Sequence, residues 1–231
     1  MDKTADVRFE HSSVLLWTIP LDASGVPGSE ILSEDERQRA ARFHFDIHRH
    51  RFITARTALR RILGSCLDTA PASVVFHYSP GGKPFLAGSP IRFNLSHSDA
   101  YALVAVAFGR DVGVDLEQIR HQDLLSLAAR FFTPSEYAAV ASASGAQRPS
   151  LFYRVWTRKE AYLKACGVGL SLALDSFSVS TAPDPDASLL TSSSGPDELA
   201  RWQFLPIQAP PDFAAALVVE RGPVQLSMHT L

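Results

Sequence analysis

The first signs of chemistry in this sequence are two acidic residues placed two positions apart. Asp115 and Glu117 belong to the segment VGVDLEQI at 112–119, whose alternation of apolar and polar residues predicts a β-strand. Because successive side chains of a strand point to opposite faces, both carboxylates project to the same side. Two such groups repel each other unless a cation lies between them, and their hard oxygen atoms suit Mg²⁺. The spacing also fits a solvated edge strand that carries two exposed acids.

A helix predicted over residues 151–166 carries a lysine where a core residue is expected. At about 100° per residue, Lys159 falls in the middle of the apolar sector that contains Phe152, Val155 and Leu163. Burial of an unpaired ammonium group costs several kcal/mol. Lys159 must therefore extend its charged end to solvent or meet a negative partner, either a carboxylate or a bound phosphate.

Glu160 lies at the border of the same sector, and Lys164 follows one helical turn later. If both were exposed, they would form a routine ion pair that contributes a few tenths of a kcal/mol. Together with Lys159 and the two strand acids, however, they indicate a cleft in which carboxylates and lysines converge. A metal ion and a polyphosphate would satisfy both signs of charge, so we favour a metal–polyphosphate site.

Other basic and polar groups fit an anion site without establishing one. The glycines of GGK at 81–83 allow close backbone approach and Lys83 adds a positive charge, although this stretch lacks P-loop spacing and also suits a hairpin turn. Ser96 and His97 end the strand-like segment 91–98, where a phosphate-binding role and a purely structural role are both open. The early helices are basic, and a few of their arginines would suffice to hold a phosphate.

Motifs of classical nucleophilic and zinc enzymes are absent from the sequence. There is no GxSxG, HExxH or CxxC pattern. Cys66 and Cys166 lie far apart, as expected of reduced and mostly buried thiols. We therefore expect the attacking nucleophile to come from a partner molecule.

Composition and charge restrict the class of protein. The 231 residues are 46% hydrophobic and 20% charged, with a formal net charge of −2. This balance lacks the positive charge of a nucleic-acid or anionic-membrane binder. No apolar run approaches the roughly 20 residues that span a bilayer, and the first residues lack the layout of a secretory signal. We expect a cytoplasmic protein with no nucleic-acid partner and no membrane partner.

The elements that must position these groups are a mixture of strands and helices. Strands are expected at 14–19, 73–79, 91–98, 101–108, 112–119, 176–180, 201–207 and 213–220, and helices from 33, over 47–64, over 124–132, from 133 and over 151–166. The nearly all-apolar segment 101–108 predicts a central strand covered on both sides. We predict an α+β fold of two similar halves, 1–110 and 111–231, related by a pseudo-twofold duplication. Each half would be a small, mostly antiparallel sheet packed with helices.

Taken together, these stretches resemble the Sfp-type 4′-phosphopantetheinyl transferases. The matching segments, in the order of the family, are GGKP at 81–84, FNLSHS at 93–98, GVDLE at 113–117, RVWTRKEAYLKACGVGL at 154–170 and LDSFSV at 174–179. The charged positions of GVDxE and WxxKExxxK show no departure from the family pattern. The KEA form is similar to the broad-range branch that serves secondary metabolism.

The resemblance implies a reaction and a set of site residues. Members of the family transfer the 4′-phosphopantetheine arm of coenzyme A to a serine of an apo acyl or peptidyl carrier protein and release 3′,5′-ADP. By resemblance, Asp115, Glu117 and Glu160 would hold Mg²⁺, with Mn²⁺ as an alternative, and Lys159 and Lys164 would neutralise phosphate charge. The positions that match the grip on the adenine and 3′-phosphate end are Lys83, Pro84, Ser96, His97, Arg51 and, less securely aligned, Arg39.

The resemblance also implies how the two halves divide the work. The half 1–110 would grip the adenine and 3′-phosphate, and the half 111–231 would hold the metal and dock the carrier through segment 167–174 and the helices at 123–140. Glu160, or a metal-bound water beside it, is expected to act as general base, with Lys164 stabilising the reacting phosphate. We expect a monomer. The alternatives are a non-catalytic module that binds carrier protein or coenzyme A, and a Mg²⁺-dependent hydrolase of a nucleotide diphosphate.

Overall fold

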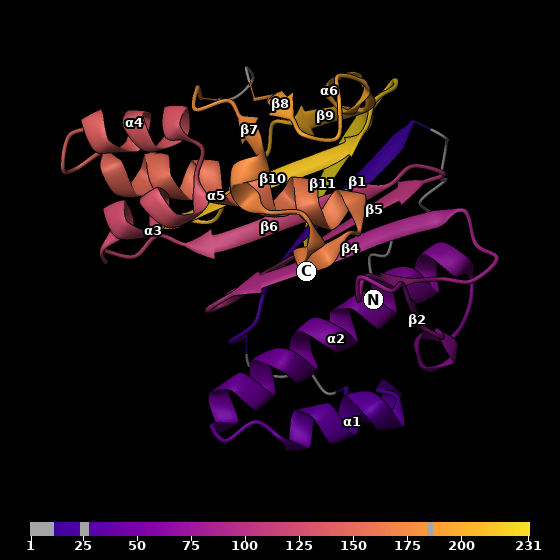
Figure 1. Ribbon diagram of the computed structural model, residues 1–231. Coiled ribbons are helices and arrows are strands. Elements are labelled where there is room, and N and C mark those ends of the chain that lie inside the picture. The colour runs from indigo at the N-terminus through magenta and orange to yellow at the C-terminus, as the bar shows by residue number, and fades with distance from the viewer. Residues whose placement is uncertain (1–11, 24–27, 184–186) are drawn as a thin grey trace.

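Two β-sheets pack face to face between helices in the computed structural model, which describes residues 12–23, 28–183 and 187–231 (Figure 1). The larger sheet has the order β11–β1–β5–β4, formed by Gln225–Thr230, Ser13–Pro20, Tyr101–Phe108 and Ile91–Ser98. The smaller has the order β6–β10–β9, formed by Val112–Gln118, Phe213–Glu220 and Trp202–Leu205. Neighbouring strands in these two sheets are antiparallel except β11 and β1. The predicted α+β fold with two largely antiparallel halves is confirmed.

The central strand β5 is covered on both faces, as its apolar sequence predicts. Val104 and Val106 pack into the core beneath the helices of the first half, whereas Leu103 and Ala105 pack toward the second sheet. All four side chains are fully buried. The core between the sheets therefore joins the two halves into one body.

Helices cover the outer faces of the sheets. Helices α1 (Glu34–Ala41) and α2 (Asp46–Leu67) lie on the side of the larger sheet, and α3 (Leu124–Phe131), α4 (Pro134–Ser142) and α5 (Arg148–Cys166) lie on the side of the smaller one (Figure 1). Ser33 and Thr133 form capping boxes at the starts of α1 and α4. A short helix, α6 (Asp197–Arg201), precedes β9. None of the described helices has the length and apolar character needed to cross a membrane.

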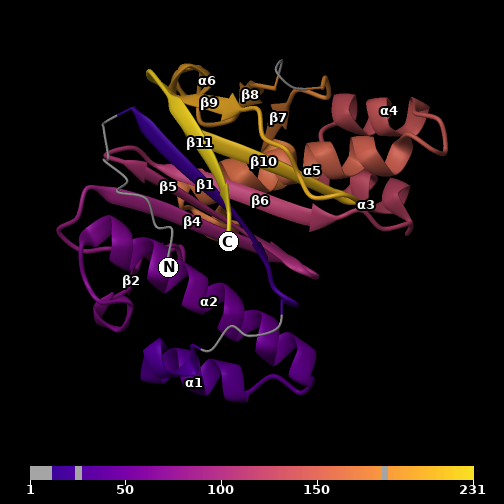
Figure 2. The same cartoon turned by 180° about the vertical axis from the view of Figure 1, so that it is seen from behind.

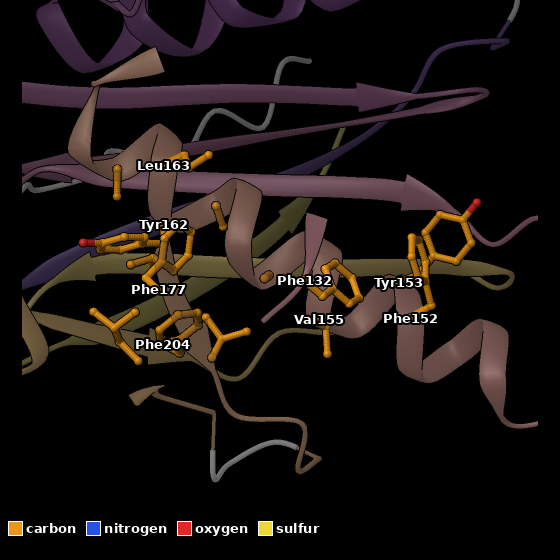
Figure 3. Packing of buried hydrophobic residues seen from close by; sticks show 14 of the residues in the cluster. Phe132, Phe152, Tyr153, Val155, Tyr162, Leu163, Phe177 and Phe204 are labelled. Carbon is orange, nitrogen blue, oxygen red and sulfur yellow. The ribbon is translucent and has the colours of Figure 1, made fainter. Parts of the chain in front are cut away.

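Helix α5 is held by an apolar core and by close contact with β6. Phe152, Val155 and Leu163 are buried in a cluster that also contains Phe177 of β7 (Phe177–Val179), which pairs with β8 (Leu189–Ser192) (Figure 3). At Gly113 of β6, a Cβ atom would collide with backbone atoms of the helix. Glycine at this position allows α5 to approach the strand that carries the two acids.

The last strand departs from the sequence-based prediction. Figure 2 shows β11 running beside β1, with which it pairs in parallel. This strand was not predicted, because its residues are largely exposed and show no regular alternation of burial. The larger sheet thus contains strands from both ends of the chain. Of the strand expected at 73–79, only His77–Tyr78 forms a strand, β2, which pairs with β3 (Pro84–Phe85).

Candidate active site

Side chains of β4 connect the edges of the two sheets. Asn94 Oδ1 accepts a hydrogen bond from Val114 N at 2.9 Å, Ser96 Oγ from Leu116 N at 3.3 Å, and Ser98 Oγ from Gln118 N at 3.1 Å. The three residues alternate along β4 and therefore share one face. They join the edge strands of two separate sheets through side chains, and they bring β4 beside the acids of β6.

The two strand acids have polar partners along this seam, the line of contact between β4 and β6. Ser96 Oγ donates to Asp115 Oδ1 at 3.0 Å, and Ser98 Oγ donates to Glu117 Oε2 at 2.9 Å. Lys164 of α5 approaches from the other side, its Nζ 2.6 Å from Asp115 Oδ1 and 2.9 Å from Ser96 Oγ. The structure thus brings Asp115, Ser96 and Lys164 together from β6, β4 and α5.

The electrostatics of the acids reflect their crowding. Burial, followed by the negative charge of Asp115, raises the pKa of Glu117. Burial raises the pKa of Glu160 as well, and the charges of Asp115 and Glu117 add to this effect. The three carboxyl groups therefore lie close enough to repel one another, as expected of groups that share a cation.

One oxygen of this cluster fits a metal ligand. Asp115 Oδ2 is buried and, among the described residues, has no hydrogen-bond partner. A buried acceptor without a partner is costly unless a ligand satisfies it. Hard oxygen donors of this kind suit Mg²⁺. Within the described residues, however, no three His, Cys, Asp or Glu side chains are already arranged around a common ion position.

A cleft of about 250 Å³ opens beside these groups. Its walls are Gly81, Gly82, Lys83, Pro84, Asn94, Glu160, Leu163, Lys164, Gly167 and Gly169. The loop at 81–83 packs backbone to backbone on the segment after α5, and a Cβ atom at Gly81 would collide with the carbonyl oxygen of Gly167. The expected close approach of the glycine loop is therefore made to the protein itself, across the seam between the halves.

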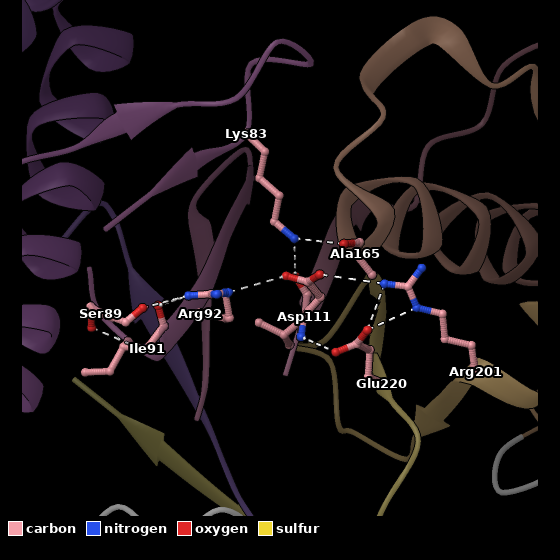
Figure 4. Close-up of polar contacts among 9 residues, drawn as sticks. Lys83, Ser89, Ile91, Arg92, Asp111, Ala165, Arg201 and Glu220 are labelled. Atoms are coloured by element: carbon pink, nitrogen blue, oxygen red, sulfur yellow. Dashed lines mark hydrogen bonds and ion pairs between the residues drawn. The ribbon is translucent and has the colours of Figure 1, made fainter. Parts of the chain in front are cut away.

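Lys83 lines both this cleft and a neighbouring cavity of about 450 Å³. Its Nζ donates to Val112 O at 3.1 Å and Ala165 O at 2.9 Å, and burial lowers its pKa. Figure 4 shows that the ammonium group lies beside Asp111, in a set of charged side chains that includes Arg92, Glu220 and Arg201. Lys83 thus connects a loop of the first half to the start of β6 and the end of α5.

Other basic groups border the opposite end of the site. His97 is exposed to solvent on one side, yet the surrounding protein, followed by the charges of Lys164 and Arg39, lowers its pKa. Arg39 and Lys164 therefore both lie near His97, an arrangement that favours an anion. Arg51 is also close to the end of β4, but its guanidinium group pairs with Asp22 and Asp99, each at 2.7 Å.

The structure gives Lys159 partners other than the phosphate that the resemblance implies. Its side chain is fully buried and its Nζ lies 2.8 Å from Glu136 Oε2. The same Nζ donates to Leu174 O at 2.8 Å and Phe177 O at 2.6 Å, so that its three donors have partners within the core. Of the two negative partners left open by the sequence, the carboxylate is the one present.

Sequence reasoning missed three residues of this region. Asn94 and Ser98 share a face with Ser96, and their spacing along β4 was a usable signal for the seam. The sequence around Glu136 indicates only that it forms a capping box with Thr133. Its contact with Lys159 depends on how α4 packs against α5, which spacing along the chain does not show.

Comparisons with known proteins agree with this geometry. Residues 111–218 match the family model described as 4′-phosphopantetheinyl transferase superfamily, and residues 23–108 match that of the N-terminal region of 4′-phosphopantetheinyl transferases. The 4′-phosphopantetheinyl transferase HetI of Nostoc sp. is 40% identical over an alignment of 233 residues, gaps included. The alignment covers 96% of this chain and 93% of the relative. A 4′-phosphopantetheinyl transferase of Bacillus subtilis is 32% identical over 159 residues, covering 68% and 70% of the two chains. Sfp of Bacillus subtilis is 29% identical over 177 residues, covering 76% and 78%.

Proposed function

This chain belongs to the 4′-phosphopantetheinyl transferase superfamily, a family of transferase enzymes, and we propose that it modifies carrier proteins. The reaction moves the 4′-phosphopantetheine arm of coenzyme A onto a serine of an apo acyl or peptidyl carrier protein and releases 3′,5′-ADP. The observation that carries the proposal is the unpartnered buried Oδ2 of Asp115, within the described residues, beside Lys164 and two further acids. Such a site suits a divalent cation and a diphosphate together.

In this proposal Asp115, Glu117 and Glu160 hold Mg²⁺, with Mn²⁺ as an alternative. The raised pKa values of Glu117 and Glu160 support it: burial raises them and the neighbouring negative charges add to the effect, and a bound cation would oppose both causes. When bound, the ion supplies positive charge that stabilises the negative charge on the diphosphate.

The side chains around the cleft position the substrate. Lys164, which holds Asp115 and Ser96, would turn part of its hydrogen-bonding capacity to the diphosphate. The loop with Lys83 and Pro84 forms one wall of the cleft. The grip on the adenine and 3′-phosphate end is assigned to Lys83, Pro84, Ser96, His97, Arg39 and Arg51, of which Arg51 would exchange its carboxylate partners for phosphate.

The chemical step is a substitution at phosphorus. The serine oxygen of the carrier forms a bond to the β-phosphorus of coenzyme A, and the bond from that phosphorus to the oxygen of 3′,5′-ADP breaks. Glu160 is assigned as the base that accepts the serine proton, because it lines the cleft beside Lys164. Positioning and charge neutralisation supply most of the remaining acceleration.

The decisive test is to incubate the protein with coenzyme A, Mg²⁺ and an apo carrier protein and to measure the mass of the carrier. A gain equal to one phosphopantetheine arm, together with release of 3′,5′-ADP, supports transfer. Nucleotide release without the gain would identify a hydrolase, and coenzyme A binding with neither would identify a binding module. We further propose that the protein acts as a cytoplasmic monomer in secondary metabolism, which size-exclusion chromatography and a panel of carriers would check.

A further inference from the structure

Glu136 and Lys159 form a buried ion pair, and neither residue lines the cleft. Their side chains are 2% and 0% exposed, and Lys159 Nζ also lies 4.4 Å from the centre of the Phe177 ring. Burial lowers the pKa of Lys159, and the charge of Glu136 opposes that shift. Removing one partner would leave an uncompensated charge in the core, so the two residues act as a unit.

Three further hydrogen bonds of the pair converge on one stretch of backbone, residues 174–179. Lys159 holds the carbonyl oxygens of Leu174 and Phe177, and Glu136 Oε1 accepts from Val179 N at 2.8 Å. Glu136 Oε2 also accepts from Thr133 N at 2.9 Å, at the start of α4. Side chains from two helices therefore fix one backbone group just before β7 and two within it.

The segment 167–176 that leads into this stretch is a wall of the cleft. Gly167 and Gly169 line the cleft together with Glu160 and Lys164. At the start of the segment, a Cβ atom on Gly169 would lie only 2.8 Å from Gly81 O, so the two backbones are in close contact. The segment is thus held by the glycine loop at one end and by Lys159 at the other, and Val168, at the end held by the loop, is 37% exposed.

We propose that the Glu136–Lys159 pair is a positioning device for the acceptor protein. By holding residues 174–179, it keeps the exposed side of segment 167–176 in the shape that the apo carrier meets beside the cleft. Lys159 then acts through the backbone of this segment and contributes to carrier binding, with no direct part in coenzyme A binding. The inference rests on the proposed function, because the acceptor is the carrier protein of that reaction.

The test uses a double variant, Glu136→Leu with Lys159→Met, which removes both charges and keeps apolar volume in the core. Glu136→Gln, which keeps the size of the side chain, serves as a milder second variant. Arg154→Met is the matched control, because Arg154 is on the same helix but donates to Thr181 O, beyond the anchored stretch. Hydrogen exchange of the unliganded proteins, the Kd of coenzyme A and the KM of the apo carrier are measured for each.

We expect the amides of 168–179 to exchange at least about tenfold faster in the double variant, with α5 protected as in the wild type. The KM for the apo carrier should rise about 10- to 100-fold, whereas the Kd of coenzyme A stays within about twofold. Glu136→Gln should shift exchange and KM in the same direction, and Arg154→Met should shift neither. If the amides of 168–179 exchange in the double variant as they do in the wild type, or if its KM for the apo carrier is unchanged, the proposal is overturned. A large loss of coenzyme A affinity in the double variant would instead identify Lys159 as a phosphate ligand. If the wild-type protein transfers no arm to any carrier, the proposed function fails, and the exchange result still decides whether the pair anchors the segment.

Discussion

Replacing Asp115 by Asn should remove most transfer activity while leaving the protein almost as stable as before. The Asp115 side chain is 3% exposed, and its Oδ1 accepts hydrogen bonds from Lys164 and Ser96. Its Oδ2 has no partner in the part of the chain that the structure describes. Asn has the same shape, so its Oδ1 can keep both hydrogen bonds without the negative charge.

Two opposing effects on the free energy of unfolding should nearly cancel. Loss of the charge weakens the Lys164 hydrogen bond by about 1 kcal/mol, the usual difference between charged and neutral hydrogen bonds. The substitution also removes a buried carboxylate that raises the pKa values of Glu117 and Glu160, which is a gain of similar size. We therefore expect a net change within about 1 kcal/mol, or about 2–4 °C in Tm for a protein of this size.

The effect on catalysis should be much larger, because the variant loses a proposed metal ligand. We expect kcat/KM for the apo carrier to fall at least about 100-fold, measured by mass spectrometry over a range of Mg²⁺ concentrations. Asp197→Asn is the control: Asp197 is exposed at the start of α6 and does not line the cleft. This control should change the rate by less than about twofold. Near-normal turnover of Asp115→Asn at limiting Mg²⁺, or a loss of more than about 8 °C in Tm, would refute the reasoning.

Three further substitutions test other parts of the site. Glu160→Gln should lower kcat by about 10²- to 10⁴-fold. Burial raises the pKa of Glu160 in the folded protein, so its charge destabilises the fold only as pH rises through that pKa and the group ionises. With metal removed from both proteins, Glu160→Gln should therefore have a higher Tm than the wild type at neutral pH and the same Tm in acid. Lys83→Met should lower the free energy of unfolding in urea by about 1–3 kcal/mol, since it leaves two carbonyl groups without their donor, and an unchanged midpoint would argue against this contact. Gly113→Ala should destabilise the protein by about 1–3 kcal/mol through collision with α5, whereas Gly145→Ala, with no described atom within 4 Å of the new methyl group, should be neutral.

Local patterns in the sequence predicted most of the elements that carry the site. The apolar run at 101–108 is the buried central strand β5, and the capping pattern at Ser33 marks the start of α1. Both depend on neighbours along the chain, which sequence reasoning can see. Strand β11 was missed because it is stabilised by its pairing with β1, whose residues lie at the other end of the chain.

For the candidate site, too, some features follow from local sequence patterns and others depend on the tertiary structure. Strand alternation was enough to place Asp115 and Glu117 on one face, and helical periodicity was enough to place Lys159 inside and Glu160 at the border of the apolar sector. Which groups these side chains meet was decided by the tertiary structure alone. Lys159 meets Glu136, and Asp115 meets Lys164 and Ser96, only because α4, α5, β4 and β6 pack together. Periodicity sets the direction of a side chain relative to its own element, whereas its partner depends on the packing between elements.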